Sequence, residues 1–200
     1  MPKVELVVSP LGVATITINR PEVLNAVDAE SHALFHDLWD TIEQRQDVRA
    51  VILTGAGERS FCAGSDMKAP SSREGVDYWS HSHPDGYCGL TVRESLDIPV
   101  IARVNGFALG GGLELMLGCD LVVAGEHAEL GLVEPLVGRV PLDGGIPALV
   151  RTLPRRHAMD LLPTGRRVSA KEALAMGLVN RVVALHDLDA AIDDYITQIL

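Results

Sequence analysis

Two glutamates stand in segments that are otherwise apolar. Glu114 lies in residues 113–117, directly after three consecutive glycines, and Glu134 lies in residues 130–137, LGLVEPLV. A carboxyl group removed from water has a raised pKa, which suits proton transfer near neutral pH. If the fold brings the two side chains together, they could hold one water molecule between them. The sequence alone does not show that they meet, and a single such acid is more often found at a helix end.

A glycine-rich junction precedes the first of these glutamates. The stretch NGFALGGGLELML, residues 105–117, follows the β-branched run 98–104, which is typical of a buried strand. A strand-to-helix junction of this kind leaves backbone N–H groups facing whatever lies beyond the strand. The alternative is that the glycines only let a helix pack closely on a sheet, with Glu114 interacting favourably with the helix dipole.

A second small-residue loop has the same character. The stretch TGAGERSFCAGSD, residues 54–66, follows the short apolar run 50–53. If that run and residues 98–104 form neighbouring strands, the N–H groups of Ser65 and Gly111 could converge on one oxygen. Two such donors would form an oxyanion hole. Taken without the glutamates, two ordinary surface loops with glycine for turn geometry are the better interpretation.

Strand and helix patterns alternate along the chain and position these loops. Residues 70–88 are polar and irregular, and we expect them to lie over or near the site. The remaining predicted elements are a hairpin of residues 4–8 and 13–18, a helix from Asp28 to about Gln46, strands over 50–53, 98–104, 121–124 and 178–184, and helices over 110–118, from Ser169 to Gly177, and from Asp187 or Asp189 onward. The alternation predicts an α/β protein.

Composition limits the classes of function. The chain has 200 residues, 47% of them hydrophobic and 22% charged, which predicts one globular domain over residues 1–200. A formal charge of −10 disfavours nucleic acid or an anionic membrane as a partner. Three cysteines without CxxC spacing predict no disulfide framework and favour the cytoplasm. We find no signal peptide and no apolar run approaching the ~20 residues that a membrane helix needs.

The C-terminal helix predicts that the chain is truncated. Apolar residues form a stripe from Leu188 to Ile199, and the sequence stops at Leu200 inside that stripe. No glycine, basic last turn or polar tail follows. We therefore expect further chain, or a partner, to cover this helix.

Other sites have weaker support in the sequence. His81 and His83, with Asp85 and Cys88 nearby, could suggest a metal site, but a solvated HxH pair is the more common case, so we predict no metal. The glycine loops do not complete GxGxxG, which argues against a dinucleotide-binding oxidoreductase. No GxSxG motif surrounds Ser65, which argues against a serine hydrolase.

Five segments in the same order resemble one known family. They are ITINRPEVLNAV, SFCAGSDMK, NGFALGGGLELMLGCD, residues 130–145 and KEALAMGLVNRVV. Together they are similar to the enoyl-CoA hydratase/isomerase (crotonase) family over almost the whole chain. The resemblance implies an α/β crotonase (ClpP-like) fold of repeated ββα units, whose C-terminal helical part is missing here. It also implies a trimer or a dimer of trimers.

The resemblance implies a role for each matched residue. Ser65 and Gly111 match the oxyanion-hole residues, which act through the backbone, so that serine in place of the more common alanine at position 65 should not matter. Glu114 and Glu134 match the two glutamates of the hydratases, whereas isomerases often keep only the second. The substrate would be a coenzyme A thioester, with no separate cofactor. The positions that match its binding region are Leu24, Ala26, Ala63, Asp66, Met67 and Lys68.

Departures from the family pattern leave the reaction open. Leu132 and Val133 replace the polar-then-proline pair that often precedes the second glutamate of hydratases. Asp143 stands where many hydratases have a small residue, and related dienoyl isomerases use an aspartate in this loop, although a turn residue before two glycines is the simpler interpretation. We predict hydration of a trans-2-enoyl-CoA to a 3-hydroxyacyl-CoA. An isomerase, a thioester hydrolase and a non-catalytic acyl-CoA-binding remnant are the alternatives.

Overall fold

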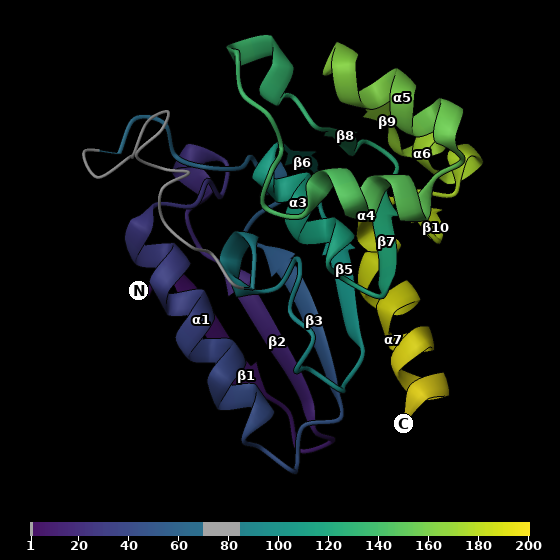
Figure 1. The fold of residues 1–200 in the computed structure, drawn as a ribbon. Coiled ribbons are helices and arrows are strands. Elements are labelled where there is room, and N and C mark those ends of the chain that lie inside the picture. Colours follow the sequence, from purple (N-terminus) through teal and green to yellow (C-terminus); the bar gives the residue numbers. More distant parts are fainter. Residues whose placement is uncertain (1, 70–84) are drawn as a thin grey trace.

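A six-stranded sheet forms the centre of the molecule (Figure 1). The computed structural model describes residues 2–69 and 85–200. β1 and β2 form the predicted antiparallel hairpin, and every other neighbouring pair in this sheet is parallel. In spatial order the strands are β1 (Val4–Val8), β2 (Val13–Ile18), β3 (Ala50–Gly55), β5 (Val100–Val104), β7 (Leu121–Gly125) and β10 (Arg181–Val183).

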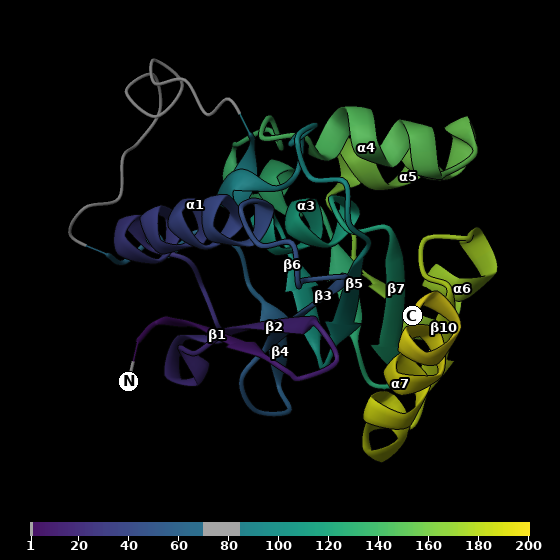
Figure 2. The same cartoon turned by 90° about the horizontal axis from the view of Figure 1, so that it is seen from below.

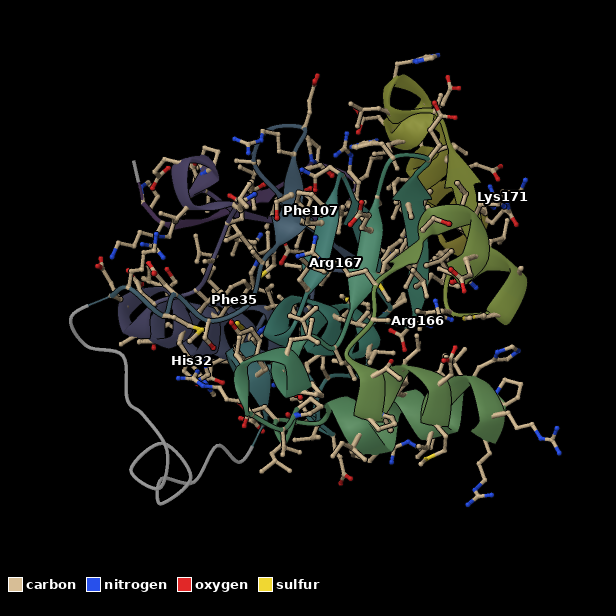
Figure 3. The ribbon with its side chains drawn as sticks, turned by 90° about the horizontal axis from the view of Figure 1, so that it is seen from above. His32, Phe35, Phe107, Arg166, Arg167 and Lys171 are labelled. Carbon is tan, nitrogen blue, oxygen red and sulfur yellow. The ribbon has the colours of Figure 1, made fainter. Side chains whose placement is uncertain are left out.

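A second sheet is built from much shorter strands. β4, β6 and β8 are parallel, and β8 pairs antiparallel with β9. The prediction of residues 54–66 as a continuous loop was wrong, because Ser60–Cys62 forms a strand in this sheet. Across it, the Arg167 guanidinium lies 5.7 Å from the centre of the Phe107 ring (Figure 3). The strands are β4 (Ser60–Cys62), β6 (Phe107–Leu109), β8 (Glu129–Gly131) and β9 (Val168–Ser169).

Consecutive strands are divided between the two sheets. β3, β5 and β7 lie in the large sheet, and the strands that follow them, β4, β6 and β8, lie side by side in the small sheet. Helix α3 (Gly111–Leu117) then follows β6 directly. This arrangement confirms the predicted α/β class and its ββα organisation.

Helix α1 (Ala29–Glu43) covers one face of the large sheet. Asp28 caps it as predicted, because its carboxylate accepts a hydrogen bond from the backbone N of Ser31 at 2.9 Å. Phe35 and Trp39 are fully buried in the main core. The helix ends at Glu43, earlier than the predicted end at Gln46.

Helix α7 (Leu188–Ile199) covers the opposite face (Figure 2). Its buried side chains Leu188, Ile192 and Ile196 pack in one cluster with Ala50 and Ile101. Neighbouring strand residues point the other way into the main core, as the alternation of side chains along a strand requires. Asp187, one of the two predicted starts of this helix, stands at the N-cap position, and its side chain makes no capping bond.

The remaining helices connect the sheets. Helix α6 begins at the Ser169 cap and ends before Gly177, as predicted, whereas β10 is shorter than the predicted strand 178–184. Within the described ranges, no helix is long and apolar enough to cross a membrane. These connecting elements are η1 (Pro21–Val23), η2 (Tyr87–Gly89), η3 (Glu134–Val137), α4 (Gly145–Thr152), α5 (Arg155–Thr164), α6 (Ala170–Met176) and η4 (Leu185–Asp187).

Candidate active site

The two predicted backbone donors lie next to each other. β3 and β5 are adjacent, as predicted, and so are β4 and β6, so the loops after these strands leave the same edge. A Cβ atom on Gly64 would lie only 3.1 Å from the backbone N of Gly111, which shows how closely the two loops approach. Neither Ser65 N nor Gly111 N donates a hydrogen bond to the described residues. Within residues 2–69 and 85–200, both amides are therefore unused, as the predicted oxyanion hole would require.

The peptide at Ser65 is held by a short bridge to Val27. Val27 N donates to Gly64 O, and Asp66 N donates to Val27 O, each at 2.8 Å. These two bonds use Gly64 O and Asp66 N, and they leave the N–H group of Ser65 unused. The donor is therefore fixed in place before any ligand binds, as electrostatic stabilisation of a transition state requires.

Glu114 is buried at the start of α3. Its side chain is almost fully enclosed, and its Oε1 accepts a hydrogen bond from Gly145 N at 2.8 Å. Burial is the main cause that raises the pKa of Glu114, to about 8, and the charges of Glu134 and Asp143 act in the same direction. The hydrogen bond from Gly145 opposes this shift without cancelling it. Glu114 therefore carries a proton over much of the neutral range.

Glu134 lies next to the glycine junction that precedes α3. It is the first residue of η3, and a Cβ atom on Gly110 would lie 3.2 Å from its Oε1. Burial, followed by the charge of Asp143, raises the pKa of Glu134 above its usual value. Its Oε2 is buried and has no hydrogen-bond partner among the described residues. A buried carboxyl oxygen without a hydrogen-bond partner lowers the stability of the fold unless a ligand donates a hydrogen bond to it.

Asp143 completes a cluster of three carboxyl groups. Its charge raises the pKa of both glutamates, so all three groups interact electrostatically. It precedes Gly144, the N-cap residue of α4, as the turn interpretation predicts. Its carbonyl oxygen accepts bonds from Thr91 Oγ1 and from Tyr87 N. The backbone of Asp143 therefore has a clear structural role, and a chemical role for its carboxylate stays a prediction.

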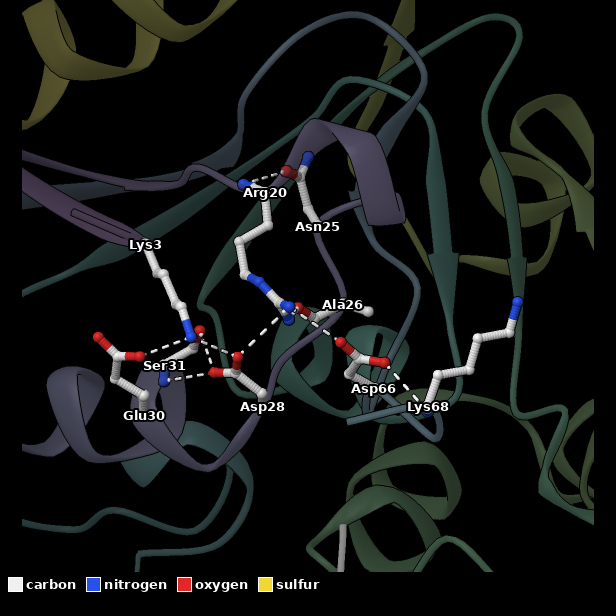
Figure 4. Close-up of polar contacts among 9 residues, drawn as sticks. All are labelled: Lys3, Arg20, Asn25, Ala26, Asp28, Glu30, Ser31, Asp66 and Lys68. Atoms are coloured by element: carbon white, nitrogen blue, oxygen red, sulfur yellow. Dashed lines mark hydrogen bonds and ion pairs between the residues drawn. The ribbon is translucent and has the colours of Figure 1, made fainter. Parts of the chain in front are cut away.

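The positions predicted to bind coenzyme A are connected by hydrogen bonds. Leu24 has a left-handed backbone, with φ of 57°, and its carbonyl accepts a bond from Ala63 N at 3.1 Å. Met67 is 52% exposed. Lys68 is also exposed, and its side chain extends away from the neighbouring ion pairs (Figure 4). Met67 and Lys68 are therefore accessible to a ligand, whereas Ala26 is buried, and the contact of these positions with coenzyme A stays a prediction.

Arg20 joins two of these positions and was missed from the sequence. Its guanidinium donates to Ala26 O at 2.5 Å and to Asp66 Oδ2 at 2.9 Å, and it lies 3.3 Å from Asp28 (Figure 4). Burial alone would raise the pKa of Asp28, but hydrogen bonds from Lys3 and Ser31 and the charge of Arg20 lower it to about 2. The sequence feature that could have indicated a role for Arg20 is its position at the end of an apolar strand, directly before Pro21.

The structure does not assemble a metal site from the described residues. No three His, Cys, Asp or Glu side chains in residues 2–69 and 85–200 are placed to hold a metal ion. Asp85 lies 3.5 Å from Arg93, and Cys88 is fully buried. His81 and His83 lie outside the described residues, so the HxH interpretation is not addressed.

The fold and the two converging loops define the crotonase class of α/β protein. The profile of the enoyl-CoA hydratase/isomerase family matches residues 9–200, and the chain belongs to that family. It is 42% identical over 182 residues to (E)-benzylidenesuccinyl-CoA hydratase of Thauera aromatica, covering 88% of this chain. It is also 42% identical over 173 residues to carnitinyl-CoA dehydratase of Salmonella arizonae, covering 86% of this chain.

Solved structures show the same fold. An enoyl-CoA hydratase from Bacillus anthracis superimposes with a TM-score of 0.90 over 99% of this chain, at 34% identity. A carnitinyl-CoA dehydratase from Mycobacterium avium superimposes with a TM-score of 0.88 over 100% of this chain, at 42% identity. This chain spans 69% and 65% of the two curated relatives above and 76% and 77% of these two solved chains.

Proposed function

We propose that this protein hydrates the 2,3 double bond of an enoyl-CoA thioester, or catalyses the reverse dehydration. One observation carries the proposal. The buried Glu114 and the partly buried Glu134 both have raised pKa values, and they lie near a glycine junction at which the described chain leaves the N–H group of Gly111, like that of Ser65, unused. Relatives named as a hydratase and a dehydratase at 42% identity support the same reaction type.

The two amides would stabilise the charge that the reaction creates. Attack of water oxygen at C3 moves the double-bond electrons to the thioester oxygen and forms an enolate. The N–H groups of Ser65 and Gly111 lie at the ends of adjacent strands and can both donate to that oxygen. Loss of one such donor typically lowers kcat by about 10²–10³-fold.

The glutamates would move the protons. One carboxylate accepts a proton from water as its oxygen bonds to C3, and the other carboxyl group gives its proton to C2 as the enolate collapses. The net reaction adds one water molecule to the double bond. A proton then passes from one glutamate to the other, which restores the starting state in which the two carboxyl groups together hold one proton. Burial raises the pKa of both glutamates, and the charge of Glu134 adds to the rise at Glu114, so a proton held by Glu114 is the one we expect to be given to C2. Glu134 Oε2 would gain a hydrogen-bond partner from the water.

The test follows the absorbance of the conjugated thioester as trans-2-enoyl-CoA substrates of several chain lengths are consumed. We expect rapid loss of absorbance with formation of the 3-hydroxyacyl product. Glu114→Gln and Glu134→Gln should each lower kcat by about 10²–10⁴-fold. Glu126→Gln, at an exposed position, is the matched control and should behave as the wild type. No turnover of any substrate by folded wild-type protein would overturn the proposal.

The alternative reactions give different products in the same assay. Formation of a 3-enoyl-CoA would indicate an isomerase, and release of free thiol would indicate a hydrolase. Tight binding of acyl-CoA without any product, unchanged in Glu134→Gln, would indicate a non-catalytic binder. We expect a trimer or a dimer of trimers in solution, which light scattering at known concentration measures directly.

A further inference from the structure

Tyr87 lies against the proposed oxyanion hole. A Cβ atom on Gly111 would lie 2.5 Å from Cζ and 2.6 Å from Cε2 of the Tyr87 ring. The hydroxyl-bearing end of the ring therefore covers Gly111, and only a residue without a side chain leaves room for it. This contact explains why glycine is required at position 111, where φ is not positive.

The hydroxyl of the same ring reaches the other donor. Tyr87 Oη lies 3.5 Å from Ser65 Oγ. A serine Oγ is separated from its own backbone N by only two intervening carbon atoms, a distance of about 3 Å from covalent geometry. Thus the phenol spans the space between the two residues whose amides would bind the thioester oxygen.

The backbone around Tyr87 is held firmly in an unusual conformation. Tyr87 N donates to Thr91 Oγ1 at 2.8 Å, and the next carbonyl, of Cys88, accepts from Trp39 Nε1 at 2.9 Å. Cys88 has a positive φ of 53°, which a side chain other than glycine rarely adopts. Strained backbone that is fixed by its surroundings is common at functional sites.

A phenol is not needed to fill this space. Tyr87 is only 3% exposed, and His32 of α1 (Figure 3) packs beside it with ring centres 6.3 Å apart. Phenylalanine would fill the same volume with an apolar ring and no hydroxyl. The hydroxyl beside Ser65 is therefore what distinguishes tyrosine from phenylalanine at this position.

We propose that the Tyr87 hydroxyl donates a third hydrogen bond to the thioester oxygen, beside the amides of Ser65 and Gly111. This inference rests on the proposed acyl-CoA chemistry and adds a residue to it. A side-chain donor would strengthen as negative charge develops on the oxygen, so it would favour the enolate over the bound substrate.

Tyr87→Phe is the direct test, because it removes only the hydroxyl. We expect kcat for enoyl-CoA hydration to fall about 10- to 100-fold, near or below the usual cost of one oxyanion donor, with KM within about threefold of the wild type. Tyr195→Phe is the matched control, since Tyr195 lies on α7 and stacks under Arg181 with 4.0 Å between the guanidinium and the ring centre. It should leave both constants unchanged.

A second measurement does not depend on hydration. Acetoacetyl-CoA ionises to an enolate with its own ultraviolet absorbance, so at a fixed, mildly alkaline pH its spectrum reports how strongly the site stabilises that charge. We expect wild-type protein to raise the enolate fraction and Tyr87→Phe to raise it clearly less. Equal enolate fractions and equal kcat in the two proteins would overturn the proposal. Wild-type protein that hydrates no substrate yet shows the Tyr87-dependent spectrum would contradict the hydratase function while supporting the third donor.

Discussion

Gly145 N donates a hydrogen bond to Glu114 Oε1 at 2.8 Å, so the first residue of α4 fixes the carboxyl group of α3. The contact leaves no space for a side chain. A Cβ atom on Gly145 would lie 2.7 Å from the same oxygen and 2.8 Å from Glu114 Cγ. The orientation of the proposed catalytic acid therefore depends on a glycine in another helix.

Gly145→Ala should displace Glu114 without removing its carboxyl group. We expect kcat to fall at least tenfold, because small displacements of a catalytic group have large effects on rate. Overpacking of this kind costs about 1–3 kcal/mol of stability. Steady-state kinetics together with denaturant unfolding separate the two effects. Wild-type kcat in a folded Gly145→Ala protein would show that Glu114 does not need this contact.

Glu114→Gln should change how stability depends on pH. The pKa of Glu114 is raised from 4.5 to about 8, so the folded state binds its proton more tightly than the unfolded state does. The resulting stability is complete below the unfolded pKa and is lost as pH rises through the folded value. Between pH 5 and 8, the free energy of unfolding of the wild type should therefore fall relative to that of Glu114→Gln, by up to about 1.4 kcal/mol per pH unit. Parallel unfolding curves for the two proteins across that range would contradict the shift.

Arg20→Gln should weaken coenzyme A binding more than it slows chemistry. The change leaves Asp66 and Asp28, which are only 11% and 10% exposed, without their shared cation. Removing one partner of a buried pair is strongly destabilising, by about 3–5 kcal/mol when burial is complete, so a smaller loss is expected here. We expect a raised KM with kcat within about threefold. Arg45→Gln breaks an exposed pair with Asp47 and is the control, with an expected effect below about 1 kcal/mol.

Lys68→Ala tests whether the exposed ammonium group of Lys68 contacts the phosphates of coenzyme A. An exposed ion pair contributes about 1 kcal/mol or less, so KM should rise about fivefold or less with kcat unchanged. The increase should shrink at high salt, and it should disappear with dephospho-CoA thioesters if Lys68 contacts the 3′-phosphate. Lys171→Ala, at an exposed position on α6, is the control (Figure 3). The same rise in KM in both variants would exclude a specific contact at Lys68.

Much of the large sheet could be predicted from local patterns. Residues 4–8, 13–18 and 50–53 carry long or alternating apolar runs, and Asp28 and Ser169 are strong helix caps. The adjacency of the strands before Ser65 and Gly111 was a hypothesis from the glycine loops, and the sheet order confirms it. The prediction that the N–H groups of Ser65 and Gly111 lie close together followed from this adjacency of the two strands.

The small sheet and the surroundings of Tyr87 could not be predicted in this way. β6 has three residues and β9 has two, which is too short for any periodicity to show. Tyr87 stands between two glycine-containing turns at the end of a polar stretch, where no motif distinguishes it. Its relation to Gly111 depends on segments that meet only in the tertiary fold. A side chain recruited through long-range packing leaves little trace in the local sequence.

The division of consecutive strands between two sheets has a consequence for how the protein forms. Apart from the β1–β2 hairpin, each strand pair in the described chain joins segments separated by at least one intervening element. Such non-local pairing is slow, because the entropy of closing a loop is lost before the contact is gained. During synthesis, the edge of β3 that pairs with β5 stays without hydrogen-bond partners until β5 has been made. The nascent chain is therefore expected to expose an aggregation-prone edge until that strand is complete.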